Sequence, residues 1–113
     1  MSKVATIDGI GIEQGSDNPY ADLGYPEADE MLGKARLAHE IGEIVKRRHL
    51  TQQRAAELLG MPQPKLSEML RGKFRGISQA KMIECLNRLG RDVDIVVKKT
   101  KRRPLGHTHV VVA

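Results

Sequence analysis

The stretch LTQQRAAELLGMPQPKLSEMLRGK, Leu50 to Lys73, carries two short helical patterns separated by a glycine and two prolines. Apolar residues recur at helical spacing in both halves: Ala55, Ala56 and Leu59 in the first, and Leu66, Met69 and Leu70 in the second. Thr51 is placed to cap the first helix, and Gly60 to end it, because a sharp exit needs a residue that accepts positive φ. The stretch therefore predicts two helices joined by a very short turn.

The two prolines are start signals for the second helix rather than breaks within it. Pro62 and Pro64 fall in the cap and first turn, where backbone N–H groups have no intrahelical acceptor to lose. Helices joined by so short a turn cross closely, so the crossing needs a small residue. Ala56, four residues before Gly60, meets that need. The pattern predicts a helix-turn-helix at residues 51–71.

Upstream, residues 26–49 predict one long helix, or two with a bend near Gly33 or Gly42. Pro26 suits a first turn, and acidic residues at the start and basic residues at the end complement the helix dipole. Between them, apolar residues recur at helical spacing: Leu37, Ile41 and Ile44. Residues 1–25 lack helical periodicity and are rich in Gly, Asp, Ser, Asn and Pro, which predicts an acidic, extended, partly disordered arm.

Downstream, Ser78 is predicted to cap a further helix that Gly90 ends, which completes a helical domain at residues 26–90. Residues 91–113 are predicted to form a C-terminal β segment and basic tail. Its first part, DVDIVVKK, alternates as a strand does, and a basic stretch then leads to a second β-prone run, HVVVA. A lone strand would leave its backbone unpaired, so it is predicted to pair with HVVVA as a hairpin or with the same segment of a second subunit.

Composition and charge narrow the class of protein. A chain of 113 residues with three aromatic residues suits one domain with a modest aliphatic core. Residues 1–32 carry seven acids and one base, a net −6, whereas the remainder carries 18 bases and seven acids, a net +11. Such a basic body indicates either a nucleic-acid surface or an ordinary positive surface. The absence of a long apolar run and of a signal segment predicts an intracellular, cytoplasmic protein.

The quoted stretch resembles the λ-repressor-like, or XRE, family of helix-turn-helix DNA-binding domains. The resemblance covers about 40 residues, from Leu50 to Leu89. The residues that carry it are Gln52, Ala55, Ala56, Leu59, Gly60, Met61, Leu66 and Met69. It implies a mainly α fold, a helix-turn-helix bundle with a long N-terminal helix. The order of acidic arm, long helix, helix-turn-helix and terminal DVDIVVKK strand also looks like that of HigA-type antitoxins.

The resemblance implies a role for particular residues, because in the family the second helix lies in the major groove of DNA. The implied base readers are Gln63, Lys65, Ser67 and Glu68. Gln63 leads, since its amide suits a bidentate pair with adenine, whereas Pro64 replaces a residue that is often polar and cannot donate a hydrogen bond. The implied phosphate contacts, which position the protein without reading sequence, are Gln52, Arg71, Lys73 and Arg75.

These observations predict a dimeric DNA-binding transcriptional repressor that occupies a palindromic operator, as the antitoxin of a toxin–antitoxin pair. The acidic arm would then dock onto a ribonuclease-like toxin with a positive surface, or serve only as a solubilising leader. Two alternatives stay open. One is a standalone XRE-type transcription factor without a toxin partner, and the other is a protein-interaction module that has kept the fold and lost DNA binding.

The sequence predicts no catalysis, no metal and no cofactor. His107 and His109 would project from the same side of a strand, but two imidazoles without a nearby thiolate or carboxylate make a poor metal site. His39 and His49 are predicted to lie on the surface. Cys85 lies among apolar residues of the last helix, which predicts a buried, inert thiol. No Gly-rich phosphate loop or nucleophile motif appears.

Overall fold

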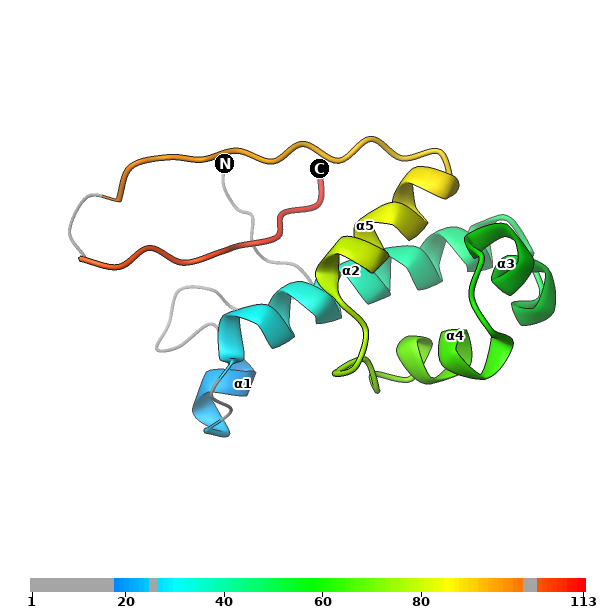
Figure 1. The fold of residues 1–113 in the computed structure, drawn as a ribbon, viewed down its shortest axis with the longest axis horizontal. Coiled ribbons are helices and arrows are strands. Elements are labelled where there is room, and N and C mark those ends of the chain that lie inside the picture. Colours follow the sequence, from blue (N-terminus) through cyan, green and yellow to red (C-terminus); the bar gives the residue numbers. More distant parts are fainter. Residues whose placement is uncertain (1–17, 25–26, 101–103) are drawn as a thin grey trace.

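A computed structural model describes residues 18–24, 27–100 and 104–113, and over these residues it contains five helices and no strand. The helices are α1 (Pro19–Asp22), α2 (Ala28–Arg47), α3 (Gln52–Leu59), α4 (Gln63–Leu70) and α5 (Gln79–Arg88) (Figure 1). The mainly helical prediction is therefore confirmed. None of these helices is both long and apolar enough to cross a membrane.

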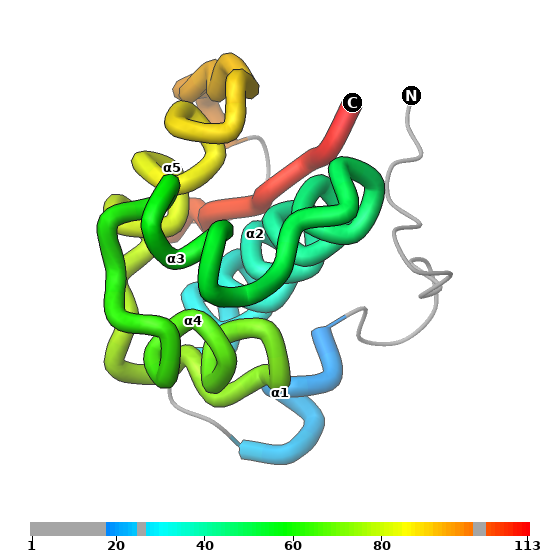
Figure 2. Tube along the Cα trace, turned by 90° about the vertical axis from the view of Figure 1, so that its right-hand side faces the viewer, coloured from blue at the N-terminus to red at the C-terminus, as the bar shows by residue number. Residues whose placement is uncertain are grey.

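The long helix α2 is the axis of the fold. Helix α5 packs beside it, and α3 and α4 form one end of the molecule, with α4 also against α2 (Figures 1 and 2). The core that these four helices enclose is aliphatic, as the composition predicts. Its most deeply buried side chains are Ile41, Ile44, Leu59, Leu66, Met69, Met82 and Cys85.

Helix α2 is one continuous helix of 20 residues, so the alternative of two helices is wrong. Just after its C-cap residue, Arg48, the chain passes through the left-handed region at His49, with φ 55°. The N–H of Leu50 then reaches back to the carbonyl of Val45 at 3.0 Å, which satisfies a carbonyl that the ending helix leaves open. Histidine tolerates positive φ better than most non-glycine residues do. His39 and His49 are both exposed, as predicted.

The helix-turn-helix forms as the capping pattern predicts. The hydroxyl of Thr51 accepts a hydrogen bond from the N–H of Arg54 at 3.0 Å and caps α3. Gly60 ends α3 with φ 66°, and the N–H of Met61 donates to the carbonyl of Ala56 at 3.1 Å. Pro62 is the N-cap residue of α4 and Pro64 is its second residue, so both prolines stand where no backbone donor is lost.

The last helix also has its predicted ends. The Ser78 hydroxyl accepts a hydrogen bond from the N–H of Lys81 at 3.0 Å. Gly90, with φ 86°, follows the C-cap, and the N–H of Arg91 donates to the carbonyl of Leu86 at 2.9 Å. The chain therefore leaves α5 from a fixed point.

The prediction of an extended arm over residues 1–25 needs a correction at residues 18–24, whereas residues 1–17 lie outside the described part of the chain. The short helix α1 forms because the Asn18 side chain accepts hydrogen bonds from the N–H groups of Tyr20 and Ala21. The same amide donates to the carbonyl of Ala28 at 3.0 Å, which fastens α1 to the start of α2. Capping and tertiary contact replace the helical periodicity that four residues cannot show.

The predicted C-terminal β segment is not formed. Residues 91–100 and 104–113 run out and back as two extended segments (Figure 1), and neither is a strand. The return segment is held by α2 instead, since the Arg36 guanidinium donates to the carbonyl of Val110 at 3.0 Å. The hairpin prediction is therefore wrong for the described residues, because a strand needs a ladder partner and HVVVA does not supply one.

The turn at Gly60 gives a test of the fold. Gly60→Ala would place a Cβ at positive φ and 3.1 Å from the guanidinium of Arg88, so we expect it to lower the free energy of unfolding by about 1–2 kcal/mol. Gly76→Ala is the matched control, because a Cβ there meets nothing within 4 Å and no positive φ is required. Urea unfolding of both variants measures the difference, and equal stabilities would contradict this account of the turn.

Candidate nucleic-acid interface

The first turn of α4 projects from the end of the molecule that α3 and α4 form (Figure 2). Leu66 and Met69 point into the core with no exposed area, so the opposite face of this helix is left to solvent. Gln63, Lys65 and Glu68 are exposed. Within the described part of the chain, the side chains of Gln63 and Lys65 have no hydrogen bond or ion pair, so their polar groups are available to a ligand.

Ser67 differs from the other predicted base readers. It is only partly exposed, and its hydroxyl accepts a hydrogen bond from the guanidinium of Arg71 at 2.6 Å. A predicted base reader and a predicted phosphate contact are therefore joined to each other along one face of α4. This bond orients Arg71 along the helix and leaves the O–H of Ser67 as a donor for another group.

The N-terminus of α3 supplies a second group of donors beside α4. Gln52 is exposed and is the first residue of α3, as its predicted phosphate role requires. Backbone N–H groups in the first turn of a helix have no acceptor within the helix, and the helix dipole favours an anion there. The Thr51 cap uses one of these groups, that of Arg54, and leaves those of Gln52 and Gln53 to other acceptors.

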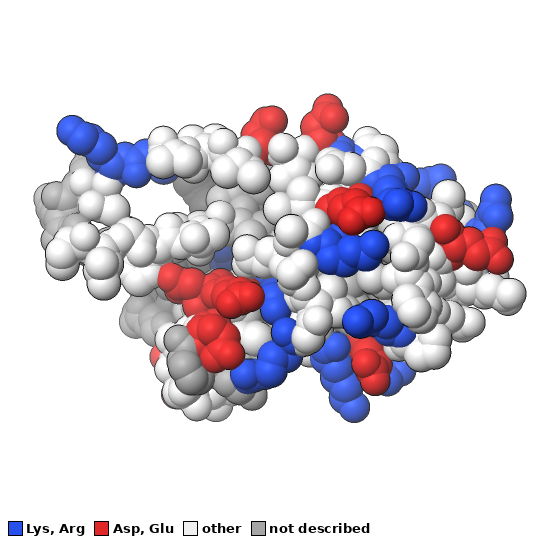
Figure 3. All heavy atoms as spheres, in the orientation of Figure 1, with Lys and Arg blue, Asp and Glu red and all other residues white. Residues whose placement is uncertain are grey.

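The loop after α4 carries further positively charged side chains and is anchored in the core by two buried apolar residues. Arg71 and Lys73 are exposed, while Phe74 and Ile77 are 3% and 5% exposed and anchor the loop in the core. Basic side chains gather around α4 and this loop, whereas acidic side chains lie over α1 and the start of α2 (Figure 3). On this face the basic side chains near α4 and the acidic side chains near α1 are thus gathered at different places, although acidic side chains also lie among basic ones elsewhere (Figure 3).

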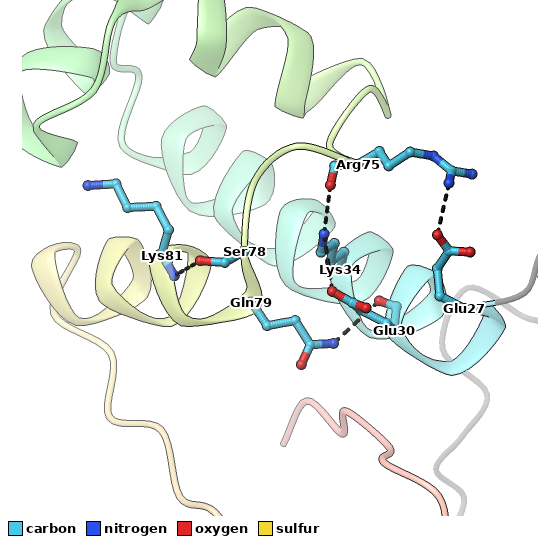
Figure 4. Close-up of polar contacts among 7 residues, drawn as sticks. All are labelled: Glu27, Glu30, Lys34, Arg75, Ser78, Gln79 and Lys81. Atoms are coloured by element: carbon cyan, nitrogen blue, oxygen red, sulfur yellow. Dashed lines mark hydrogen bonds and ion pairs between the residues drawn. The ribbon is translucent and has the colours of Figure 1, made fainter.

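A polar cluster fastens the same loop to α2 (Figure 4). Lys34 is 4% exposed, and its ammonium group donates to the carbonyl of Arg75 at 2.9 Å and lies 3.4 Å from Glu30. The side-chain amide of Gln79 donates to the carbonyl of Glu30 at 3.3 Å. A buried ammonium group is stabilised only by such partners. Lys34 therefore holds the loop that follows α4 in a fixed position against α2.

Arg75, a predicted phosphate contact, turns toward α2 rather than toward α4. Its guanidinium donates to the carboxylate of Glu27 at 2.9 Å, and both side chains are partly exposed (Figure 4). The geometry therefore separates Arg75 from Arg71 and Lys73. Arg75 can contact a phosphate only where the backbone of DNA replaces or joins Glu27.

Two contacts that hold the elements of this surface in place were not predicted from the sequence. Lys34 lies three residues after Met31 and three before Leu37, on the apolar side of α2, and a lysine at that spacing is a detectable sign of a buried cation. Arg88 donates to the carbonyl of Leu58 at 3.3 Å and so covers the end of α3 beside the Gly60 turn. Nothing in the local sequence pairs residue 88 with residue 58.

The remaining reactive side chains lie away from this surface. Cys85 has no exposed area, and its burial raises the pKa of the thiol, an effect that Glu84 adds to and that Lys81 and Arg88 oppose. The thiol is therefore neutral, as expected of an inert cysteine. The rings of His107 and His109 lie 6.2 Å apart, and His107 contacts the Asp29 carboxylate. Among the described residues no three His, Cys, Asp or Glu side chains gather as metal ligands would.

Comparisons with known proteins agree with this geometry. A family model described as a helix-turn-helix domain matches residues 19–98. A solved structure assigned to the XRE family of transcriptional regulators has a TM-score of 0.70 and 38% sequence identity, and the match covers 78% of this chain and 100% of that one. A comparison with curated proteins found no match. The matched region contains all five helices and every predicted contact residue.

The cluster around Lys34 gives a second test. Lys34→Met would remove the hydrogen bond from Lys34 to the carbonyl of Arg75 and the ion pair with Glu30, so we expect a loss of about 1–3 kcal/mol in the free energy of unfolding. Lys81→Met is the matched control on α5, because its ion pair with Glu84 spans 3.7 Å between partly exposed groups and contributes about 0.5 kcal/mol or less. Thermal or urea unfolding compares them. An equal loss in both variants would mean that Lys34 does not hold the loop.

Proposed function

The chain belongs to the helix-turn-helix domain family, and we propose that it is a sequence-specific DNA-binding transcriptional repressor. The observation that carries the proposal is the exposed first turn of α4, where the Gln63 and Lys65 side chains have no partner within the described residues. A helix of this kind enters the major groove with its N-terminal residues against base edges. The proposal is supported by the solved structure of the XRE-family regulator.

Base reading falls to Gln63 and Lys65 in this proposal. The Gln63 amide can donate to N7 and accept from N6 of one adenine, and the Lys65 ammonium can donate to O6 and N7 of guanine. Glu68, one turn further along, can accept from the amino group of cytosine. Ser67 accepts a hydrogen bond from Arg71 and can still donate its own O–H to a base. Pro64 offers an apolar ring that can touch a thymine methyl group.

Phosphate contacts hold α4 in register on the duplex. Gln52 at the start of α3, together with the first-turn N–H groups, takes one phosphate, and Arg71 and Lys73 take others on the far side of α4. These contacts carry no sequence information. They make the affinity strongly salt-dependent, because each neutralised phosphate releases counterions.

The repressor acts as a dimer on a palindromic operator. One α4 reads a site of only a few base pairs, so two copies are needed for useful specificity, and their half-sites lie about one helical turn apart. Occupancy of such an operator keeps the transcription machinery from the promoter. The two-fold symmetry of the protein and that of the DNA then match.

The layout of the chain supports an antitoxin role for this repressor. Residues 1–32 carry a net charge of −6, which suits docking onto the positive surface of a ribonuclease-like toxin. A standalone transcription factor would use the same DNA surface without that partner. A protein-interaction module would keep the fold and make no use of Gln63.

A titration on duplex DNA tests the repressor. Wild type should prefer DNA from just upstream of its own coding region over scrambled DNA, and Gln63→Ala should lose about 1–3 kcal/mol of that preference. Lys73→Ala should weaken binding to both duplexes equally, and should lower by about one the slope with which the logarithm of the affinity falls with the logarithm of the salt concentration. Lys81→Ala, on α5, is the charge-matched control and should leave the affinity for both duplexes unchanged. Equal binding of own and scrambled DNA, with no effect of Gln63→Ala, would favour the interaction module.

A growth assay tests the antitoxin role separately. If a ribonuclease-like gene lies beside the gene of this chain, its product should arrest growth when expressed alone and should be neutralised by co-expression of the full chain. Removal of residues 1–17, which carry Asp8, Glu13 and Asp17, should weaken neutralisation and leave operator binding intact. If the shortened chain still neutralised the toxin fully, residues 1–17 would not be part of the toxin contact.

A further inference from the structure

We propose that the first half of α2 docks an extended peptide of a partner protein, in which a histidine or a cation stands three residues before a branched apolar residue. In this structure a segment of the chain itself, the return segment of residues 104–113, occupies the position of that peptide. Figures 1 and 2 show it in red along the first half of α2, on the side away from α4. The proposed site is therefore separate from the DNA surface.

Three residues of α2 make up this docking face: Asp29, Gly33 and Arg36. Spacings of four and three residues place them along one face of the helix. The Asp29 carboxylate contacts the ring of His107, and the Arg36 guanidinium donates to the carbonyl of Val110 at 3.0 Å. Gly33 lies between these two contacts. The docking face therefore meets the return segment at two polar points with a gap for an apolar side chain between them.

The spacing of the two polar contacts suits an extended chain. From Asp29 to Arg36 the helix rises by about 10 Å, at roughly 1.5 Å per residue. From His107 to Val110 an extended chain advances by about 10 Å as well. A straight peptide can therefore meet the carboxylate and the guanidinium at once. Because Arg36 bonds a backbone carbonyl, its contact is open to any sequence in extended conformation.

Gly33 lets the peptide approach the helix closely. A Cβ at this position would lie 3.2 Å from Cγ2 of Val110 and 2.5 Å from Nε2 of Gln79. Gln79 belongs to the first turn of α5, and its amide is held by the carbonyl of Glu30 at 3.3 Å (Figure 4). The missing side chain thus leaves room on α2 for a branched apolar residue beside α5.

The acidic start of α2 defines the other end of the peptide. A carboxylate only accepts hydrogen bonds, so the group that meets Asp29 must donate. The Asn18 amide already donates to the other Asp29 oxygen at 3.4 Å, and Glu27 and Glu30 are close in sequence. The return segment accordingly carries two histidines and no acidic residue. Histidine, lysine or arginine fits here, whereas a carboxylate would be repelled.

The return segment is held by few contacts, so a partner peptide can displace it. All of its residues are exposed except Val110, which is partly buried. Among the described residues, its polar contacts with α2 are those to Asp29 and Arg36. Neither the return segment nor residues 91–100 form a strand, so little offsets the entropy of closing this long loop. A peptide with additional contacts therefore competes well.

The experiment frees the docking face in the full chain. Val110→Asp removes the apolar contact of the return segment and leaves all of α2 unchanged. A synthetic peptide of residues 104–113 is then titrated into isotope-labelled protein, and NMR shifts are followed at Gly33 and Arg36. The Val110→Asp chain should bind this peptide about fivefold or more tightly than wild type does, because the wild-type docking face is partly occupied. Equal binding by both chains, or no binding to the variant, would overturn the proposal.

Two glycines of α2 supply a matched control. In the Val110→Asp chain, Gly33→Ala should weaken peptide binding by about fivefold or more, because its Cβ fills the space that the branched side chain needs. Gly42→Ala on the same helix should leave binding unchanged, since its Cβ meets only Cδ2 of Leu70 at 3.4 Å. Equal effects of the two substitutions would show that the peptide binds elsewhere.

Variants of the peptide test the chemistry of the partner. A peptide with His107→Lys should bind the Val110→Asp chain at least as tightly as the parent peptide, and one with His107→Asp about tenfold more weakly, because two carboxylates then meet. Parent-like binding of the His107→Asp peptide would contradict the role of Asp29. Shifts at Gly33 and Arg36 that depend on the concentration of wild-type protein alone would assign the docking face to a second copy and overturn the partner peptide.

Discussion

The turn from Gly60 to Pro62 is the constraint on which the rest of the structure depends. Gly60 reverses the chain at φ 66°, and Pro62 restores the extended backbone from which α4 starts. Only two residues separate the turn glycine from the first residue of α4, so a few backbone dihedral angles set the relative direction of the two helices. Arg88 locks the turn from outside by its bond to the carbonyl of Leu58. The exposed face of α4 is consequently presented at a set angle to the N-terminus of α3, where the proposed function places a phosphate.

The loop that would face DNA in the proposed function is held in place by buried residues that would not contact DNA. Lys34 is buried in α2 and bonds the carbonyl of Arg75, while Phe74 and Ile77 fill the core beneath the same loop. The ordered loop lowers the conformational entropy that Lys73 would lose on contacting a phosphate. A buried cation with one carbonyl and one carboxylate partner is costly to disrupt, which keeps the loop in one position.

The sequence predicted those elements whose causes are local. The caps at Thr51, Ser78, Gly60 and Gly90 formed as expected, because each depends on the conformation of a few neighbouring residues. The missed features depend on partners distant in sequence: Asn18 with Ala28, Lys34 with Arg75, and Arg36 with Val110. The strand prediction failed for the same reason. Alternation of apolar and polar residues indicates a half-buried extended segment, but it does not identify the partner strand. The contact residues on α4 follow from the family pattern, and their roles stay predictions.

The Glu27–Arg75 ion pair sets a boundary to the DNA surface. Acidic side chains crowd the start of α2, and a phosphate brought near them would meet repulsion rather than attraction (Figure 3). Arg75 stands between that acidic region and the basic loop, and its guanidinium is already bonded to Glu27 at 2.9 Å. A duplex that lies along α3, α4 and Lys73 therefore reaches Arg75, whose charge is balanced by Glu27, before it reaches the acidic residues at the start of α2. The same pair links the N-terminal end of α2 to the loop that follows α4.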